Sequence, residues 1–270
     1  MKKRVRIYYI LLIFFLCTFC ISGWKVADYY VQSEKNKTQY QQLASSVQQP
    51  EAIEGELPQE VPKETILQNP EEKTVKPAEM LPEYREIYEK NQDLVGWLSV
   101  PGTEIDLPVV QRPNDDSYYL NHDFFGNQSQ YGCPFAWSAG DVQKPSDNIT
   151  VFGHHMRDGS MFAGLDSYVD KTHWEQYPVI QFNNLYGRYF YRIFAVFITS
   201  ATPNKGFAYH RFVEAADAEE FQTFISNCKK ISLYDTGITP QYGDKILCLS
   251  TCEYTKENGR LVVAAVRIEP

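Results

Sequence analysis

The sequence predicts a mainly β fold, a barrel or a sandwich, for the part of the chain that follows position 80. Short apolar runs rich in β-branched and aromatic residues alternate there with turn residues, whereas helical patterns are few. Tyr (19 residues) and Phe (16 residues) are abundant, as suits a β-rich core. A segment of about 190 residues is long enough to bury a single core of its own.

The predicted elements follow from these patterns in chain order. The first two strands form an antiparallel hairpin around the turn Pro101-Gly102-Thr103. The predicted strands are 95–100, 105–110, 149–152, 179–182, 189–200, 245–251 and 260–268, and the predicted helices are 85–91, 161–168, 173–176 and 218–230.

An uncharged apolar run at 7–24 follows four basic residues within the first six positions. As a helix this run would be about 27 Å long, which matches the hydrocarbon core of a bilayer. Basic residues on its N-terminal side predict a cytoplasmic N terminus, so residues 1–29 are expected to form a basic tip and a single-pass transmembrane signal-anchor. A cleaved signal peptide is the competing interpretation, although Val26-Ala27 is a poor cleavage site.

Residues 30–80 are rich in Pro, Gln and Glu and contain no aromatic residue after Tyr40. Such a composition buries too little apolar area to offset chain entropy. We expect a short helical extension at about 30–45 and then an extended acidic stalk, whose role is that of a spacer. The predicted third part, 81–270, is the β domain.

The overall charge excludes one class of function. Lys and Arg number 26 against 34 Asp and Glu, which gives a formal net charge of −8. A general nucleic-acid binder needs a basic surface to contact phosphates, so this class is not expected.

Three residue types that support acyl transfer lie at strand ends. The strand 149–152 runs into Gly153 and His154, Cys252 ends another strand, and Arg260 opens the next one after a polar loop. Cys252 and Arg260 would face each other across the mouth of a hairpin. A thiolate is a strong nucleophile, and a neighbouring cation lowers the pKa of a thiol so that more of it is ionised. A His side chain can exchange protons with amines, and an Arg side chain can donate hydrogen bonds to an oxyanion.

Other roles for the cysteines remain open from the residues alone. Cys252 could be an ordinary small apolar residue at a strand end. Cys248 lies four residues earlier, about 13 Å away along a strand, so the two thiols cannot bind one metal ion, and we predict neither a metal nor an organic cofactor. With Cys133 and Cys228 outside the apolar run, three disulfide pairings are open, of which Cys133–Cys228 would spare Cys252. Reduced thiols are the favoured interpretation.

Taken together, these segments resemble the class B branch of the sortase family. The likeness runs from about Leu81 to the C terminus, and its ordered motifs make Cys252 a predicted nucleophile. The segments that carry it are Val95-Gly96-Trp97, 101–111, 118–124, Phe152-Gly153-His154-His155-Met156, 155–162, and Leu249-Ser250-Thr251-Cys252 followed by Arg260.

The resemblance implies an eight-stranded β-barrel with a few peripheral helices, on the outer face of a Gram-positive cell membrane. It implies a cysteine transpeptidase that cuts a C-terminal sorting motif of secreted proteins, holds the acyl group as a thioester at Cys252, and passes it to an amine of a peptidoglycan precursor. His154 matches the general acid/base, because it directly follows the Gly at the strand end, and Arg260 matches the oxyanion or substrate-orienting residue.

The resemblance also suggests residues that bind the peptide. Ser250 and Glu253 flank Cys252, Leu120 contributes to the motif pocket, and the helix 218–230 walls the groove. Cys248 stands where the family more usually has Thr, and we interpret it as a core residue.

Two alternative functions use the same residues. An extracellular cysteine peptidase would release the acyl group to water, and a catalytically silent domain would bind peptides without cutting them. The sequence names neither the sorting motif nor the client protein nor the acceptor amine.

Overall fold

The computed structural model describes residues 2–47, 79–255 and 257–268. The chain divides into two compact units, Met1–Leu43 and Ala44–Pro270. The first unit belongs to helix α1 (Lys2–Ser46), and the second holds the β domain.

Helix α1 contains the predicted apolar run and continues to Ser46, past the short extension expected at 30–45. In the described part of the chain it is long and apolar enough to cross a membrane, with a mean hydropathy of 2.1 in its most apolar window. The predicted stalk falls mostly on residues 48–78, which lie outside the described residues, so that part remains a prediction.

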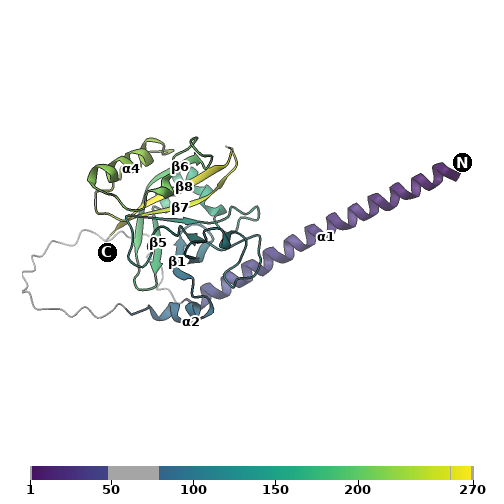
Figure 1. Cartoon of the computed structure of the whole chain (residues 1–270), viewed down its shortest axis with the longest axis horizontal. Helices are drawn as coiled ribbons and strands as arrows, with labels where there is room; N and C mark the ends of the chain where they lie inside the picture. Colours follow the sequence, from purple (N-terminus) through teal and green to yellow (C-terminus); the bar gives the residue numbers. More distant parts are fainter. Residues whose placement is uncertain (1, 48–78, 256, 269–270) are drawn as a thin grey trace, which may run out of the picture. The chain divides into compact units, whose positions relative to one another are not determined.

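Eight strands form a closed barrel in the order β1-β2-β3-β4-β7-β8-β6-β5, so the predicted β-barrel is confirmed (Figure 1). Closure satisfies the backbone groups that a sheet edge would expose. The strands are β1 (Leu94–Val100), β2 (Ile105–Val110), β3 (Phe135–Ala136), β4 (Asn148–Phe152), β5 (Val179–Asn184), β6 (Phe190–Ser200), β7 (Ile246–Glu253) and β8 (Gly259–Ile268).

The predicted hairpin between β1 and β2 is confirmed, and its turn shows why Gly is needed there. Gly102 has a φ of +75°, and a Cβ at this position would lie 2.4 Å from the ring of Tyr177. Only a residue without a side chain combines this backbone conformation with that contact.

The main helix of the domain, α4 (Ala218–Lys230), has the predicted bounds. Asp217 caps its N terminus by accepting a hydrogen bond from the backbone N–H of Glu220 at 2.9 Å. Its buried face packs on strands β6, β7 and β8. The residues of α4 in this cluster are Phe221, Phe224, Ile225 and Cys228.

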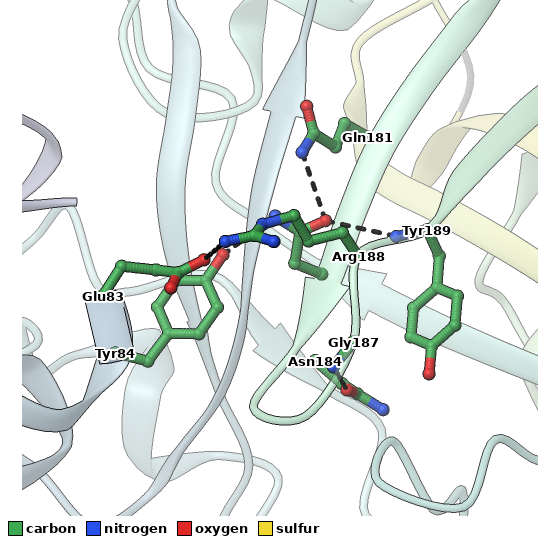
Figure 2. Close-up of polar contacts among 8 residues, drawn as sticks. Glu83, Tyr84, Gln181, Asn184, Gly187, Arg188 and Tyr189 are labelled. Carbon is green, nitrogen blue, oxygen red and sulfur yellow. Dashed lines mark hydrogen bonds and ion pairs between the residues drawn. The ribbon is translucent and has the colours of Figure 1, made fainter. Parts of the chain in front are cut away.

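Helix α2 (Pro82–Lys90) begins with a proline at its first position, which is pre-organised for a helix start, three residues earlier than predicted. Glu83 forms an ion pair with Arg188 in the turn between β5 and β6 (Figure 2). Asn183 donates a hydrogen bond to the Tyr84 hydroxyl at 2.9 Å, and both residues are fully buried. These contacts fasten the segment that precedes the barrel to the β5–β6 hairpin.

Three short 3₁₀ helices and one short α-helix complete the described elements. The predicted helix at 161–168 is a 3₁₀ helix, and strand β3, only two residues long, was not predicted. These elements are η1 (Tyr118–Leu120), η2 (Ala163–Val169), η3 (Tyr209–Arg211) and α3 (Lys171–Gln176).

Candidate functional site

Parallel pairing of β4 with β7 brings the ends of two predicted strands to the same rim of the barrel. Phe152 is paired with Ser250, and the Gly153 N–H donates to the Ser250 carbonyl at 3.1 Å. One residue further along, the Thr251 hydroxyl donates to the Gly153 carbonyl at 2.9 Å. His154 and Cys252 therefore follow adjacent, hydrogen-bonded positions on neighbouring strands.

Cys252 and Arg260 are direct register partners in the antiparallel pair of β7 and β8, and both are partly exposed. The predicted hairpin is therefore confirmed, although the strands reach Glu253 and Gly259, so its loop is shorter than expected. Arg260 donates from Nη1 to the Gly259 carbonyl at 2.9 Å. A thiol and a guanidinium thus share one hairpin mouth.

Two backbone contacts hold His154 in place. Its Nε2 lies 2.7 Å from the carbonyl oxygen of Leu120 in η1, and its own carbonyl accepts from the Phe162 N–H at 2.9 Å. A carbonyl can only accept, so Nε2 is the donor in this contact, and Nδ1 takes no part in it. Gly153 lies against the Phe162 ring, which a Cβ there would meet at 2.5 Å.

The two adjacent histidines have different surroundings. The Nε2 atom of His155 lies 2.6 Å from Oδ2 of Asp166, and its ring packs edge-on against Tyr254. His154 instead touches a neutral carbonyl, that of Leu120. The structure therefore gives His155 a carboxylate partner and leaves His154 as the candidate for proton transfer.

The barrel thiols differ in accessibility. Cys252 is partly exposed, whereas Cys228 and Cys248 are fully buried in the same core cluster, as predicted for Cys248. Burial raises the pKa of the Cys248 and Cys228 thiols well above their usual range, which keeps them protonated. The structure forms no disulfide among the six cysteines, all of which are described.

The predicted peptide-binding residues lie in different environments. Leu120 is 38% exposed beside His154, and Glu253 is partly exposed, with Oε1 accepting from the Thr255 N–H at 2.8 Å. Ser250 is fully buried, and its Oγ lies 2.5 Å from the hydroxyl oxygen of Tyr209. Because Tyr209 covers it, Ser250 lies behind the surface that a peptide would touch.

The segment around η3 adds residues that the sequence analysis missed. The ring of His210 packs edge-on against Trp137 at 5.2 Å and Phe152 at 6.1 Å between ring centres. Burial, and then the positive charges of Arg211 and Arg260, lower the pKa of His210. No periodic pattern marks this segment, and only the fold brings it close enough to Arg260 for that charge to act on His210.

Within the described residues, no group of three or more His, Cys, Asp or Glu side chains is arranged to hold a metal ion. The chemistry that the rim residues can perform among themselves is nucleophilic attack by a thiol, proton transfer by an imidazole and anion stabilisation by a guanidinium.

Comparison with known proteins gives a consistent result. The model of the Sortase domain family matches residues 98–268. Sortase B of Staphylococcus aureus is 27% identical over 268 residues, covering 98% of this chain and 97% of that protein. Sortase B of Listeria monocytogenes is 32% identical over 188 residues, covering 69% of this chain and 74% of that protein.

Solved structures agree with these relatives. A crystal structure of Staphylococcus aureus sortase B matches with a TM-score of 0.63 and 30% identity, covering 70% of this chain and 88% of that one. A Staphylococcus aureus sortase B–substrate complex matches in fold, with a TM-score of 0.70 and 24% identity over 88% of this chain and 99% of that one. The closed eight-stranded barrel and the matched segment together show that the chain belongs to the sortase family of transpeptidases, in its class B branch.

Proposed function

We propose that this chain cleaves a sorting motif near the C terminus of secreted proteins and transfers the acyl fragment to an amine of a cell-wall precursor. The observation that carries the proposal is the register of Cys252 with Arg260, next to the strand whose end places His154. A nucleophile, an oxyanion donor and a proton-transfer group thus meet at one rim of the barrel.

The first half-reaction forms a thioester. The Cys252 thiol passes its proton to Nδ1 of His154, and the sulfur attacks the scissile carbonyl carbon. The π electrons move onto the oxygen, where the Arg260 guanidinium donates hydrogen bonds. Collapse of this intermediate breaks the C–N bond, and the leaving amine takes a proton from His154. With Nε2 of His154 directed to the Leu120 carbonyl, Nδ1 is the nitrogen that exchanges this proton.

The second half-reaction reverses the proton flow. An acceptor amine attacks the thioester and gives a proton to His154, and the Cys252 thiolate leaves as the amide forms. One Staphylococcus aureus sortase B structure holds a substrate and another sortase B structure holds triglycine, which supports a peptide donor and an amine acceptor for these relatives. Transfer to water would give a hydrolase side activity.

Three further residues are proposed to shape the peptide groove. Leu120 presents an exposed apolar surface beside His154, and Glu253 offers a carboxylate next to the nucleophile. Ser250, which is buried, would act through Tyr209 and not by direct contact with the peptide.

The same proposal extends to cellular location. The apolar part of α1 would anchor the chain in the cell membrane with its basic tip in the cytoplasm, and the barrel would act outside. Residues 30–80 would then set the distance between the membrane and the active site.

Intact-protein mass spectrometry of the full chain in detergent tests the proposal. Short peptides with candidate sorting motifs are added, and a mass increase equal to the N-terminal peptide fragment is expected, absent in Cys252→Ala. Adding triglycine should convert this adduct to a ligated product. Release of the fragment only as free acid, even with triglycine present, would favour a peptidase, and binding of a peptide without any adduct would favour a silent binding domain.

A further inference from the structure

Beyond the rim residues, a second connection joins the chain after Cys252 to the chain after His154. The Tyr254 hydroxyl donates a hydrogen bond to the His155 carbonyl at 3.2 Å. Its ring also meets the His155 ring edge-on, with 5.2 Å between centres and an interplanar angle of 86°. Tyr254 is two residues past Cys252, and His155 is one residue past His154.

The His155 ring also contacts a residue of another element. Its Nε2 lies 2.6 Å from Oδ2 of Asp166 in η2, and its side chain is only 16% exposed. The backbone of His155 also pairs with Met161, which closes the loop that carries it. The Tyr254 ring therefore packs on a histidine that is held by η2 as well as by its own loop.

We infer that Tyr254, His155 and Asp166 form a clamp that positions Cys252 relative to His154 during acyl transfer. The inference rests on the proposed function. On the barrel side, the bond between Thr251 and Gly153 joins the same two chain segments. The clamp joins them again through the exposed Tyr254, so the chain segments that carry Cys252 and His154 are connected at two places.

Exposure separates this role from ordinary stabilisation. The Tyr254 side chain is 72% exposed, so its removal uncovers little apolar surface and should leave the fold intact. Its loss should instead let the β7–β8 loop move and shift Cys252. A displacement of about 1 Å in a reacting group can lower a rate by about a hundredfold.

Kinetics of the full chain in detergent, with a sorting peptide and triglycine, test the clamp. Tyr254→Ala is expected to lower kcat about tenfold, less than a full displacement of about 1 Å would cause, with KM unchanged. Tyr254→Phe keeps the ring contact and should fall between Ala and wild type. An unchanged kcat, or a higher KM at normal kcat as for a residue that only binds peptide, would overturn the inference.

Coupling between the members provides a second test. Asp166→Ala should also lower kcat, and the double variant with Tyr254→Ala should be no slower than the slower single variant, because both changes break the same unit. Rate losses that multiply would contradict a single clamp. Tyr186→Ala is the matched control, since Tyr186 is an exposed tyrosine in the β5–β6 turn, at the end of β6 opposite to the Thr199–Arg260 pair.

A readout without any peptide distinguishes this inference from the proposed function. The pH profile of Cys252 alkylation by iodoacetamide reports its electrostatic surroundings, and peptide mapping separates Cys252 from Cys17 and Cys20. The profile of Tyr254→Ala should move toward that of His154→Ala, with an unchanged thermal unfolding midpoint. A profile identical to wild type would refute the clamp. A shifted profile in Tyr254→Ala, together with a wild-type chain that forms no thioester, would refute only the proposed function.

Discussion

Accessibility of the thiol, at the scale of single residues, separates Cys252 from the other cysteines of the barrel. Cys248 is on the same strand and the same face, yet it is fully buried beneath α4 and its pKa is raised by that burial. Cys252 lies where β7 reaches the rim and faces a guanidinium. A reactive thiol needs both access and a nearby cation, and among these cysteines the combination occurs at Cys252.

Arg260→Lys tests the geometry of the oxyanion donor. The ammonium keeps the positive charge but loses the planar fork of donors, so kcat should fall by about a hundredfold, as for loss of one oxyanion donor. Steady-state transfer kinetics measure this, with Arg267→Lys, further along β8, as the control. A near-normal rate for Arg260→Lys would show that charge alone suffices.

His210 provides a test of the same guanidinium that requires no turnover. Its pKa is lowered by burial and further by Arg211 and Arg260, so Arg260→Gln should raise it, as followed by NMR titration of the imidazole. An unchanged pKa would place Arg260 too far away to act. Because the folded-state pKa lies below the unfolded value of about 6.5, His210 should reduce stability as the pH falls below that value.

At the scale of elements, the decisive contact is the parallel pair of β4 and β7. It aligns Phe152 with Ser250, and the Thr251 hydroxyl extends the pairing to Gly153. An antiparallel hairpin alone would supply Cys252 and Arg260 but no base. The histidine arrives only because a strand from a distant part of the chain ends at the same rim.

Thr251→Val should weaken this junction. Val has nearly the same shape but no hydroxyl, so the half-buried Gly153 carbonyl loses its side-chain donor, which should cost about 1 kcal/mol of unfolding free energy. Thr251→Ser keeps the hydroxyl and serves as the control. Urea denaturation measures both, and a larger loss in Ser than in Val would mean that the methyl group matters more than the hydrogen bond.

At the scale of the whole molecule, the protein combines an apolar helix with a closed barrel, and its formal net charge is −8. The apolar window of α1 is long enough to cross a bilayer, and the barrel buries its own core without further staples. This division of roles predicts a barrel that acts at a membrane surface while its fold depends only on its own residues.

Protease treatment of intact cells tests the orientation of the chain. External protease should digest the barrel region, while the membrane pellet keeps the N-terminal fragment through carbonate extraction. A deletion of residues 7–24 should leave the barrel in the cytoplasm, protected from the protease. Recovery of the mature wild-type barrel in the culture medium would instead support a cleaved signal peptide.

Local patterns by themselves determined the strands other than β3, the bounds of α4 and the pairing of Cys252 with Arg260. Each depends on alternation, capping or a hairpin between neighbouring strands, and such interactions join residues close in sequence. The resemblance to sortases added the choice of His154 and the eight-stranded barrel, which no local period encodes. The two-residue strand β3 was missed because it is too short for any alternation to show.

Only the tertiary structure decided how the rim is built. The bond between Thr251 and Gly153, the buried contact of Ser250 with Tyr209, and the effect of the Arg260 charge on the pKa of His210 join residues that are 41 or more positions apart. Such contacts depend on how the barrel closes, and closure is a property of all strands together. Composition and periodicity describe which face of a strand is buried, but they do not say what covers it.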